Sequence, residues 1–433
     1  MDKESLNAVK LDEILTLLKN FLNGEIFEIT SSERTNPILF HYYNEIIRYW
    51  SKLNFIIKKT LRSLNHFNNQ DIIEIEKCLY FAYRIIWEAA SNDSILKELK
   101  VDETPNNKKY SNFFNKLRSF SWDKALEGKS PEEKLSIEEA IPSFVIQHLS
   151  GVMSLDMLKN NIVSMNSLDK TYFTAYIKGN IQNLLISENF KKDKEIENLY
   201  HYPNKFKSEL LRSKLYQSGD LIILDKGSAA IVNILEPKIN EKICDICAAP
   251  GIKTNLIAHI TTNKARIIAG DFHTERVKIM KKLLLQLKNN NVHILNEDSI
   301  TFPIRFENYF DRILIDAPCT GSGTFLNNPE LKWRQNEGFL HQNITLQKKL
   351  FKTALKLLRP NGILVYSTCS LYPEEGEYII LDYLEQLEPL NLPKWFSPSY
   401  SINNSHVPGT GRLFPSIHNT QGFFIGKFKK KDL

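Results

Sequence analysis

The stretch YFDRILIDAPCTGSG, residues 309–323, sets an apolar run against a polar, glycine-rich loop. Its β-branched and aromatic residues predict a buried strand that ends near Asp316. From about residue 216 onward, similar short runs recur at DLIIL, KICDIC, ARIIAGD, VHILN and GILVYSTC, with helical patterns such as RVKIMKKLLLQLKNN between them. This alternation predicts an α/β fold, with a parallel sheet covered by helices on both faces. The run GFFIGKFKKK near the C-terminus predicts an added antiparallel edge strand.

The chain before this region has a different pattern. Apolar residues at helical spacing, as in LDEILTLLKNFLNG, predict an all-helical domain over residues 1–127. Residues 128–215 are mixed, because SPEEKLSIEEAIP and PSFVIQHLS look helical and TYFTAYI looks like a strand. The segment LYHYPNKFKSELLRSKLY interleaves tyrosines with lysines, so it is either an RNA-contacting strip or a solvated helix with a basic face. Residues 216–433 then form the α/β domain.

Length and composition limit the class of protein. A chain of 433 residues exceeds one compact core, and its net charge of +6 is compatible with a nucleic-acid partner without demanding one. Five cysteines in so long a chain do not form a disulfide framework, which favours a reducing, cytoplasmic setting. The charged start MDKESLNAVK lacks a signal-peptide pattern, and we find no apolar run of membrane-spanning length. We therefore expect no membrane association.

Carboxylates follow several of the expected strands. Asp271 follows ARIIAG, Asp298 comes just after VHILN, and Asp316 follows RILI. Ligands of open parallel sheets bind at the carboxyl ends of the strands, and the glycine turn AAPGIKT after KICDIC would let the backbone approach one. There is no G-x-G-x-x-G, so a dinucleotide loses its main support. The pattern favours a nucleoside without pyrophosphate, such as S-adenosylmethionine, with Asp271 on its ribose and Asp298 on its adenine amino group.

Two cysteines also follow expected strands. Cys319 and Cys369 would share one crevice if their strands are neighbours. A single cysteine is usually inert core filler, but two at strand ends beside a nucleoside pocket favour a chemical role. Cys244 and Cys247 form a lone C-x-x-C without a second pair, so we expect no metal. Cys78, in a helical pattern, has no evident partner and is expected in the core.

Three motifs give a resemblance to a known family. DICAAPGIKT, DAPCTGSG and YSTCSLYPEEGE resemble the motifs of the RsmB/NSUN (Sun) family of RNA cytosine-5 methyltransferases, as do NPELKW and GRLFPSIHNTQGFF. The resemblance covers about residues 216–428. It implies a class I (Rossmann-like), seven-stranded methyltransferase domain that uses S-adenosylmethionine and acts on RNA, with ribosomal RNA favoured over transfer RNA. The N-terminal helices are similar in size and position to the family's NusB-like RNA-binding domain, and residues 128–215 to its RNA-positioning linker subdomain. Nothing suggests an obligate dimer, so we expect a monomer.

The resemblance also implies roles for individual residues. In the family, a thiolate adds to carbon 6 of cytosine, carbon 5 takes the methyl group, and loss of the carbon 5 proton expels the thiol. By resemblance, Cys369 is the nucleophile and Cys319 assists product release, while Asp316 and Lys253 hydrogen-bond the target base. Arg276 would pair with a carboxylate or support the pocket. The residues that match the cofactor pocket are Cys247, Ala248, Ala249, Pro250, Gly251, Ile252, Lys253, Asp271, Arg276, Asp298 and Asp316.

The sequence departs from the family pattern at a few positions. Ile252 replaces the usual second glycine of the first motif, and a β-branched residue disfavours positive φ, so the loop cannot need that conformation at 252. Gln421 replaces an aspartate, whereas EEGE keeps Glu375 and Glu377. These departures leave a second hypothesis open: a catalytically inactive RNA-binding or ribosome-assembly protein on a methyltransferase scaffold. A cysteine hydrolase is a distant third, because no histidine has a triad setting around Cys369.

Overall fold

The computed structural model describes residues 8–24, 36–64, 74–98, 105–167, 172–177, 190–287, 289, 291–297, 300 and 306–432. The chain divides into two compact units. The helical unit comprises Met1–Ile146 with Asn328–Trp333, and the α/β unit comprises Gln147–Asn327 with Arg334–Leu433. Within the described ranges, no helix combines the length and the apolar character needed to cross a bilayer.

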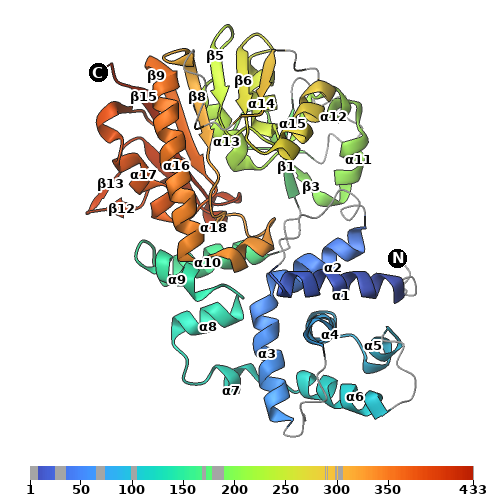
Figure 1. Ribbon diagram of the computed structural model, residues 1–433. Helices are drawn as coiled ribbons and strands as arrows, with labels where there is room; N and C mark the ends of the chain where they lie inside the picture. Colours follow the sequence, from blue (N-terminus) through green and yellow to red (C-terminus); the bar gives the residue numbers. More distant parts are fainter. Residues whose placement is uncertain are drawn as a thin grey trace. The chain divides into compact units, whose positions relative to one another are not determined.

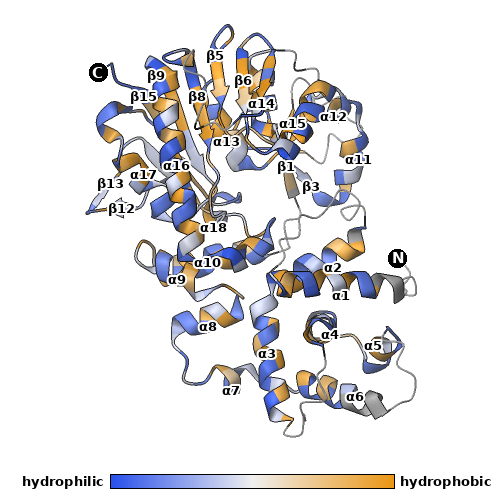
Figure 2. Ribbon diagram, viewed as in Figure 1, coloured by the Kyte–Doolittle hydropathy of each residue, from blue (hydrophilic) through white to orange (hydrophobic). Residues whose placement is uncertain are grey.

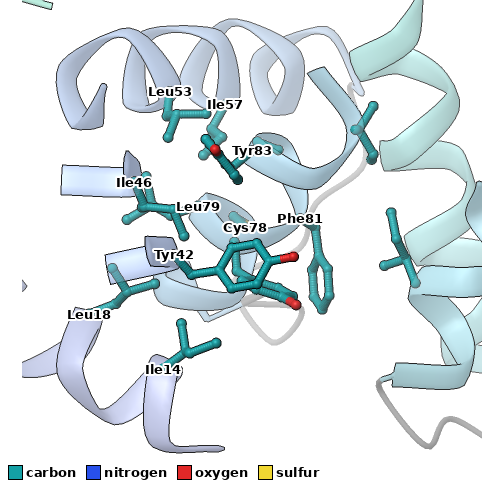
Figure 3. Packing of buried hydrophobic residues seen from close by; sticks show 14 of the residues in the cluster. Ile14, Leu18, Tyr42, Ile46, Leu53, Ile57, Cys78, Leu79, Phe81 and Tyr83 are labelled. Atoms are coloured by element: carbon teal, nitrogen blue, oxygen red, sulfur yellow. The ribbon is translucent and has the colours of Figure 1, made fainter. Parts of the chain in front are cut away.

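Helices build the helical unit, as the apolar spacing predicts. They are α1 (Ala8–Leu22), α2 (Pro37–Arg48), α3 (Trp50–Ser63), α4 (Ile75–Trp87), α5 (Asn92–Glu98), α6 (Pro105–Arg118), α7 (Trp122–Leu126) and α8 (Pro131–Glu138). Buried side chains of several of these helices share one core, where Figure 3 shows Ile14, Tyr42, Leu53 and Leu79 gathered. Cys78 of α4 is fully buried in this core, in agreement with its expected structural role.

The segment Asn328–Trp333 belongs to the helical unit although its neighbours in sequence belong to the α/β unit. It lies in the 3-10 helix η8 (Pro329–Arg334). Lys332 is fully buried and donates to the carbonyl oxygens of Arg48 at 3.1 Å and Ala140 at 3.3 Å. Trp333 Nε1 donates to the carbonyl oxygen of Ile47 at 2.8 Å. The NPELKW motif therefore serves the packing of the helices, which the sequence alone does not indicate.

A small antiparallel sheet begins the α/β unit, after α9 (Ser143–Ser150) and α10 (Leu155–Asn166). Its order is β2-β3-β1-β4. The prediction of a strand at TYFTAYI is confirmed, but the placement of DLIIL in the parallel sheet is wrong, because it joins this small sheet. The segment LYHYPNKFKSELLRSKLY begins with a strand at LYHYP, so the alternative of one basic helix over the whole segment does not hold. The strands of the small sheet are β1 (Tyr172–Ile177), β2 (Lys191–Lys192), β3 (Leu199–Pro203) and β4 (Leu221–Ile223). Helices α11 (Lys207–Arg212) and α12 (Lys214–Ser218) lie between β3 and β4 in the sequence.

The main sheet of the α/β unit carries the predicted strand and helix alternation (Figure 1). Its strand order is β11-β14-β15-β9-β8-β5-β6-β7, with β10 paired to β15. Strands β5 to β9 pair in parallel, and Figure 2 shows apolar colouring along β5, β6 and β8, which fits strands buried on both faces. The strands are β5 (Lys242–Asp245), β6 (Arg266–Gly270), β7 (Val292–Leu295), β8 (Phe310–Asp316), β9 (Leu358–Thr368), β10 (Leu387–Pro389), β11 (Ser397–Pro398), β14 (Thr410–Leu413) and β15 (Phe423–Lys430).

Two details of this sheet differ from expectation. The described sheet has nine strands where seven were expected. The two additional strands are the short strands β10 and β11, and the other seven are β14, β15, β9, β8, β5, β6 and β7. The last strand, β15, is antiparallel as predicted, but it lies between β9 and β14 and not at an edge. A separate two-stranded ribbon joins β12 (Ser401–Ile402) and β13 (Ser405–His406).

Helices cover both faces of the main sheet. Alternate residues of β8 enter different cores: Leu314 packs with Leu256, whereas Ile313 packs with Phe351. Strand order reverses at β5, which lies between β6 and β8, so the ligand crevice is expected at the carboxyl ends of β5 and β8. The helices are α13 (Lys226–Leu235), α14 (Ile252–Ile260), α15 (Thr274–Gln286), α16 (Glu337–Leu357), α17 (Glu377–Leu381) and α18 (Pro415–His418), with 3-10 turns η5 (Asn204–Phe206), η9 (Pro373–Glu375) and η10 (Leu384–Gln386).

Candidate active site

Two thiols meet at the carboxyl end of the sheet. Strands β8 and β9 are parallel neighbours, with Asp316 opposite Ser367, and a cysteine follows each strand. Cys319 Sγ lies 3.1 Å from Cys369 Sγ, and both thiols are free and half-buried. The Cys369 sulfur and burial raise the pKa of the Cys319 thiol well above its ordinary value. Cys319 therefore keeps its proton at neutral pH, and either sulfur can be the donor of the contact.

Backbone hydrogen bonds fix the loop that carries Cys319. Gly323 N–H donates to the carbonyl oxygen of Cys369 at 3.0 Å, and Gly422 N–H donates to the carbonyl oxygen of Gly323 at 2.8 Å. A Cβ at Gly323 would collide with the Gly422 backbone, so this close approach of two chains requires glycine. The loops after β8 and β9 are thus tied to each other and to the start of β15.

A buried carboxylate holds the same loop from the other side. Glu375 is fully buried, and its Oε1 accepts from the Thr320 N–H at 2.9 Å and from Gln347 Nε2 at 2.9 Å. The Thr320 hydroxyl donates to the second carboxylate oxygen. Burial raises the pKa of Glu375, although these donors oppose the shift. From sequence, Glu375 is only an acidic residue that the family motif keeps, and its contact with the residue after Cys319 is not predictable.

A charged pair stands next to the thiols. Lys253 Nζ lies 2.6 Å from Asp316 Oδ2, and the Ser367 hydroxyl donates to Asp316 Oδ1 at 2.9 Å. Burial disfavours the ammonium, but Asp316 outweighs it and raises the pKa of Lys253. Both side chains keep partial exposure, 17% for Lys253 and 25% for Asp316. The site therefore presents one fixed cation and one fixed anion to a ligand in the crevice.

The turn between β5 and α14 forms the expected cofactor side. Its one left-handed residue is Gly251, at φ 100°, whereas Ile252 already begins α14. This agrees with the inference that residue 252 does not adopt positive φ. A Cβ on Gly251 would approach Met280 Cγ to 2.9 Å. The turn comprises Cys247, Ala248, Ala249, Pro250 and Gly251; Ala248 and Ala249 are buried, Cys247 is half-buried and Pro250 is exposed.

Asp271 at the end of β6 braces this turn. Its Oδ2 accepts from the Ala249 N–H at 3.2 Å, and its Oδ1 accepts from the His273 N–H at 3.0 Å. Arg276 lies 3.6 Å from Asp271 and also donates to the Ala249 carbonyl oxygen. Both alternatives considered for Arg276, a carboxylate pair and support of the pocket, thus occur together. Asp298 lies outside the described residues.

Asp245 is a buried acid at the carboxyl end of β5 that the strand-end pattern did not single out. It ends β5, is 1% exposed, and accepts from the Thr254 hydroxyl at 2.7 Å through Oδ2. Its Oδ1 is buried without a hydrogen-bond partner, and burial raises the pKa of this carboxyl to about 7. The rule that selected Asp271 and Asp316, a carboxylate at a strand end, also applies to the aspartate inside KICDIC.

Cys244 is fully buried inside β5, and burial raises the pKa of its thiol well above the ordinary value. In the part of the chain that the structure describes, no group of three or more histidine, cysteine or acidic residues is placed to hold a metal ion.

Known proteins match this chain over the region that carries the thiols and the charged pair. Residues 232–429 match a family model described as 16S rRNA methyltransferase RsmB/F. A tRNA (cytosine(49)-C(5))-methyltransferase of Pyrococcus abyssi is 34% identical over 228 residues, which cover 50% of this chain and 72% of the relative. The chain belongs to the RsmB/F methyltransferase family. This RsmB/F-family protein is also 34% identical over 221 residues to a probable ribosomal RNA small subunit methyltransferase B of Synechocystis, covering 50% of this chain and 49% of that relative. The match therefore spans about half the length of that relative.

Solved structures share the fold of the RsmB/F-family chain. The crystal structure of PH0851 has a TM-score of 0.76 and 23% sequence identity, and covers 98% of this chain and 99% of that one. A methyltransferase homolog protein from Pyrococcus horikoshii has a TM-score of 0.60 and 27% identity, covering 70% of this chain and 99% of that one. The expectation of a Rossmann-like methyltransferase fold is thereby confirmed.

Proposed function

We propose that this RsmB/F-family protein transfers a methyl group from S-adenosylmethionine to carbon 5 of cytosine in structured RNA. Ribosomal RNA is the first candidate substrate and transfer RNA the second, because relatives with both descriptions match the chain. The observation that carries the proposal is the thiol pair at 3.1 Å beside the Lys253–Asp316 pair. An inactive scaffold has no need of two half-buried thiols and a fixed ion pair at the crevice of the sheet.

The β5 end of the crevice fits S-adenosylmethionine. Asp245 has an unpartnered buried oxygen, Gly251 permits close approach of the backbone, and Asp271 is a buried carboxylate with acceptor capacity left. When bound, the cofactor supplies an electrophilic methyl group. We assign its binding to the turn Cys247–Ile252 together with Asp271, Asp298 and Asp316, with Arg276 supporting the turn.

The chain's own residues account for activation of the base. Cytosine carbon 5 is a poor nucleophile, and addition of the Cys369 thiolate to carbon 6 moves electron density onto carbon 5. In this proposal Asp316 accepts from the amino group of the base and orients it. Lys253 donates to the carbonyl oxygen of the base and stabilises the negative charge that develops in the ring. Both groups are held ready, because they already pair with each other and with Ser367.

Release of the product uses the second thiol. Once carbon 5 is methylated, its proton passes to a solvent base and the C–H electron pair restores the carbon 5–carbon 6 double bond. The carbon 6–sulfur bond breaks, and Cys369 leaves as a thiolate. Cys319, which carries its proton, lies within hydrogen-bond distance of the departing sulfur. A thiolate that accepts a hydrogen bond is a better leaving group, so Cys319 assists this step.

We assign the two regions that precede the catalytic domain to the binding and positioning of RNA. We propose that residues 1–127 are a NusB-like RNA-binding domain, that residues 128–215 position the RNA, and that residues 216–433 are the class I catalytic domain. We also propose that the protein acts as a monomer.

The test of the proposed function is methyl transfer: the full chain, labelled S-adenosylmethionine and unmodified total RNA are incubated, and nucleosides are analysed by mass spectrometry. Labelled 5-methylcytosine is the expected product. Intact binding of RNA without any labelled cytosine would favour the inactive scaffold.

A further inference from the structure

A polar cavity of about 390 Å³ lies beside the small sheet of the α/β unit, and neither Cys319 nor Cys369 lines it. Its volume falls within the range of small-ligand sites. The small sheet and the main sheet share one core, since Tyr176 and Ile222 pack in the same buried cluster as Leu256, so the cavity has fixed walls. The side chains that matter for its chemistry are Phe173, Asn204, Lys207, Asn327, Asn419 and Gln421.

One wall of the cavity pairs an aromatic ring with a cation. Phe173 of β1 is half-buried and packs edge-on against Tyr202, with ring centroids 5.4 Å apart. Lys207 Nζ lies 5.9 Å from the centre of the Phe173 ring. Proteins bind unpaired bases through an aromatic face for stacking and a nearby cation for phosphate. The tyrosine and lysine segment whose role the sequence left open thus contributes Lys207 to a concave site.

Several amide side chains also line the cavity. Asn204, Asn327, Asn419 and Gln421 each carry both donors and acceptors. Amide side chains read the edge of a base, which presents donors and acceptors together, better than they bind a bare anion. The cavity therefore suits a nucleobase more than an inorganic ion.

A basic loop continues from the cavity. A neighbouring hollow shares His201 and Asn419 with it and is lined by Lys191, Lys192 and Lys194, all of which are exposed. Two acidic residues also line this hollow and share one lysine: Asp193 lies 2.9 Å and Glu195 2.6 Å from Lys226. Asp193 also lies 2.7 Å from His201. The exposed lysines offer contacts for an RNA backbone that leaves the cavity.

Hydrogen bonds connect the loops that carry these amides to the thiol site. Asn327 and Cys319 lie in the same segment between β8 and η8, and Gln421 directly precedes Gly422. Gly422 N–H donates to Gly323 at 2.8 Å, and Gly323 N–H donates to Cys369 at 3.0 Å. A ligand in the cavity would therefore touch the same loops that carry the two thiols.

From this arrangement we propose that the cavity binds an unpaired nucleotide of the RNA substrate close to the target cytosine. The base stacks on Phe173 and meets the amides, and the phosphates lie toward Lys207 and the lysine loop. This inference rests on the proposed function, since it names how the same substrate is held. It adds a site that holds the RNA strand next to the methylated base.

The test is photo-crosslinking of the full chain to single-stranded RNA. The probe is a random oligonucleotide pool that contains 4-thiouridine, and crosslinked peptides are mapped by mass spectrometry. The variants are Phe173→Leu and Lys207→Ala, with Lys205→Ala as the matched control, because Lys205 is equally exposed in the same segment but does not line the cavity. The RNA KM for methyl transfer is measured for each variant, and binding of S-adenosylmethionine checks that the variant is folded.

We expect crosslinks on the peptide that contains Phe173, and a rise of about tenfold in RNA KM for Phe173→Leu and Lys207→Ala. Lys205→Ala should change KM less than twofold. No crosslink at this peptide, or equal effects of the two lysine variants, would each overturn the inference. If crosslinks form at Phe173 but no cytosine is methylated, the nucleotide site stands and the proposed reaction fails. If cytosine is methylated but the RNA KM of Phe173→Leu and Lys207→Ala equals that of wild type, the proposed reaction stands and the nucleotide site fails.

Discussion

Glu375 Oε1 accepts a hydrogen bond of 2.9 Å from the backbone N–H of Thr320, the residue that follows Cys319. One buried carboxylate after β9 thus sets the position of the thiol loop after β8. Because the side chain of Gln347 also donates to this oxygen, the three groups form a network with few alternatives.

Removal of this carboxylate should therefore impair catalysis and stability together. In Glu375→Ala, the Thr320 N–H and the Gln347 amide lose a buried acceptor, which costs about 1–3 kcal/mol per unsatisfied group. We expect at least a tenfold loss in kcat and a lower free energy of unfolding. Glu375→Gln keeps an acceptor and should recover most of the stability. Equal kcat in wild type and Glu375→Ala would contradict a positioning role.

The short distance between the thiols predicts sensitivity to oxidation. Cys319 and Cys369 need only a small approach from 3.1 Å to form a disulfide, which requires S–S contact at about 2.05 Å. We expect mild oxidation to abolish methyl transfer and to give a linked Cys319–Cys369 peptide, and a thiol reductant to restore activity. Inactivation without this linked peptide, or inactivation that reductant does not reverse, would show that the two sulfurs do not meet in solution.

The ion pair should act as one unit. Lys253→Met and Asp316→Asn each remove a group held against its partner at 2.6 Å, so each should lower kcat by roughly 10²–10³-fold. Because each single change also disables the other partner, the double variant should lose little more than the worse single variant. Losses that simply multiply in the double variant would show that Lys253 and Asp316 act independently.

The buried Asp245 carboxyl should make stability depend on pH. Its pKa is raised by burial from 3.8 to about 7, so the folded state holds this proton more tightly than the unfolded state. The contribution of Asp245 to stability is therefore greatest below its unfolded pKa and is lost as pH rises toward 7. Asp245→Asn has no such proton to lose, so its stability relative to wild type should increase between pH 4 and 7.

Chemical denaturation of both proteins across this pH range measures the difference. Asp382→Asn is the control, because Asp382 is an exposed partner of Lys348 in the same unit and should show little dependence. A difference between wild type and Asp245→Asn that stays constant with pH would mean that Asp245 is not buried as a protonated acid.

The alternating strands and helices were predictable, because strands buried on both faces read as short apolar runs. Sheet membership was less accessible. DLIIL has the composition of a core strand, yet β4 pairs with β1, and the choice depends on contacts distant in sequence. The place of Asn328–Trp333 within the helical unit is equally invisible in sequence, because it depends on backbone carbonyls that accept from Lys332 and Trp333.

In the candidate site, local signals located the groups that follow strands. Cys319, Cys369 and Asp316 could be brought together in advance because parallel neighbours end at the same edge of a sheet. Glu375 could not, since its partner Thr320 lies on another loop and no spacing rule links them. Asp245 is hard to find in the sequence for a different reason. The pattern KICDIC predicts a strand that continues to Cys247, which places the Asp245 carboxylate inside the strand and not at its end.

The most direct test of the central claim is a covalent-trap assay. Wild type, Cys319→Ala and Cys369→Ala are each mixed with S-adenosylmethionine and unmodified cellular RNA, and protein–RNA adducts are separated on a denaturing gel. The account predicts that adducts accumulate with Cys319→Ala, because product release is slowed, and are absent with Cys369→Ala, because no bond to carbon 6 can form. Adducts that persist with Cys369→Ala, or that never form with any variant that binds RNA, would contradict it.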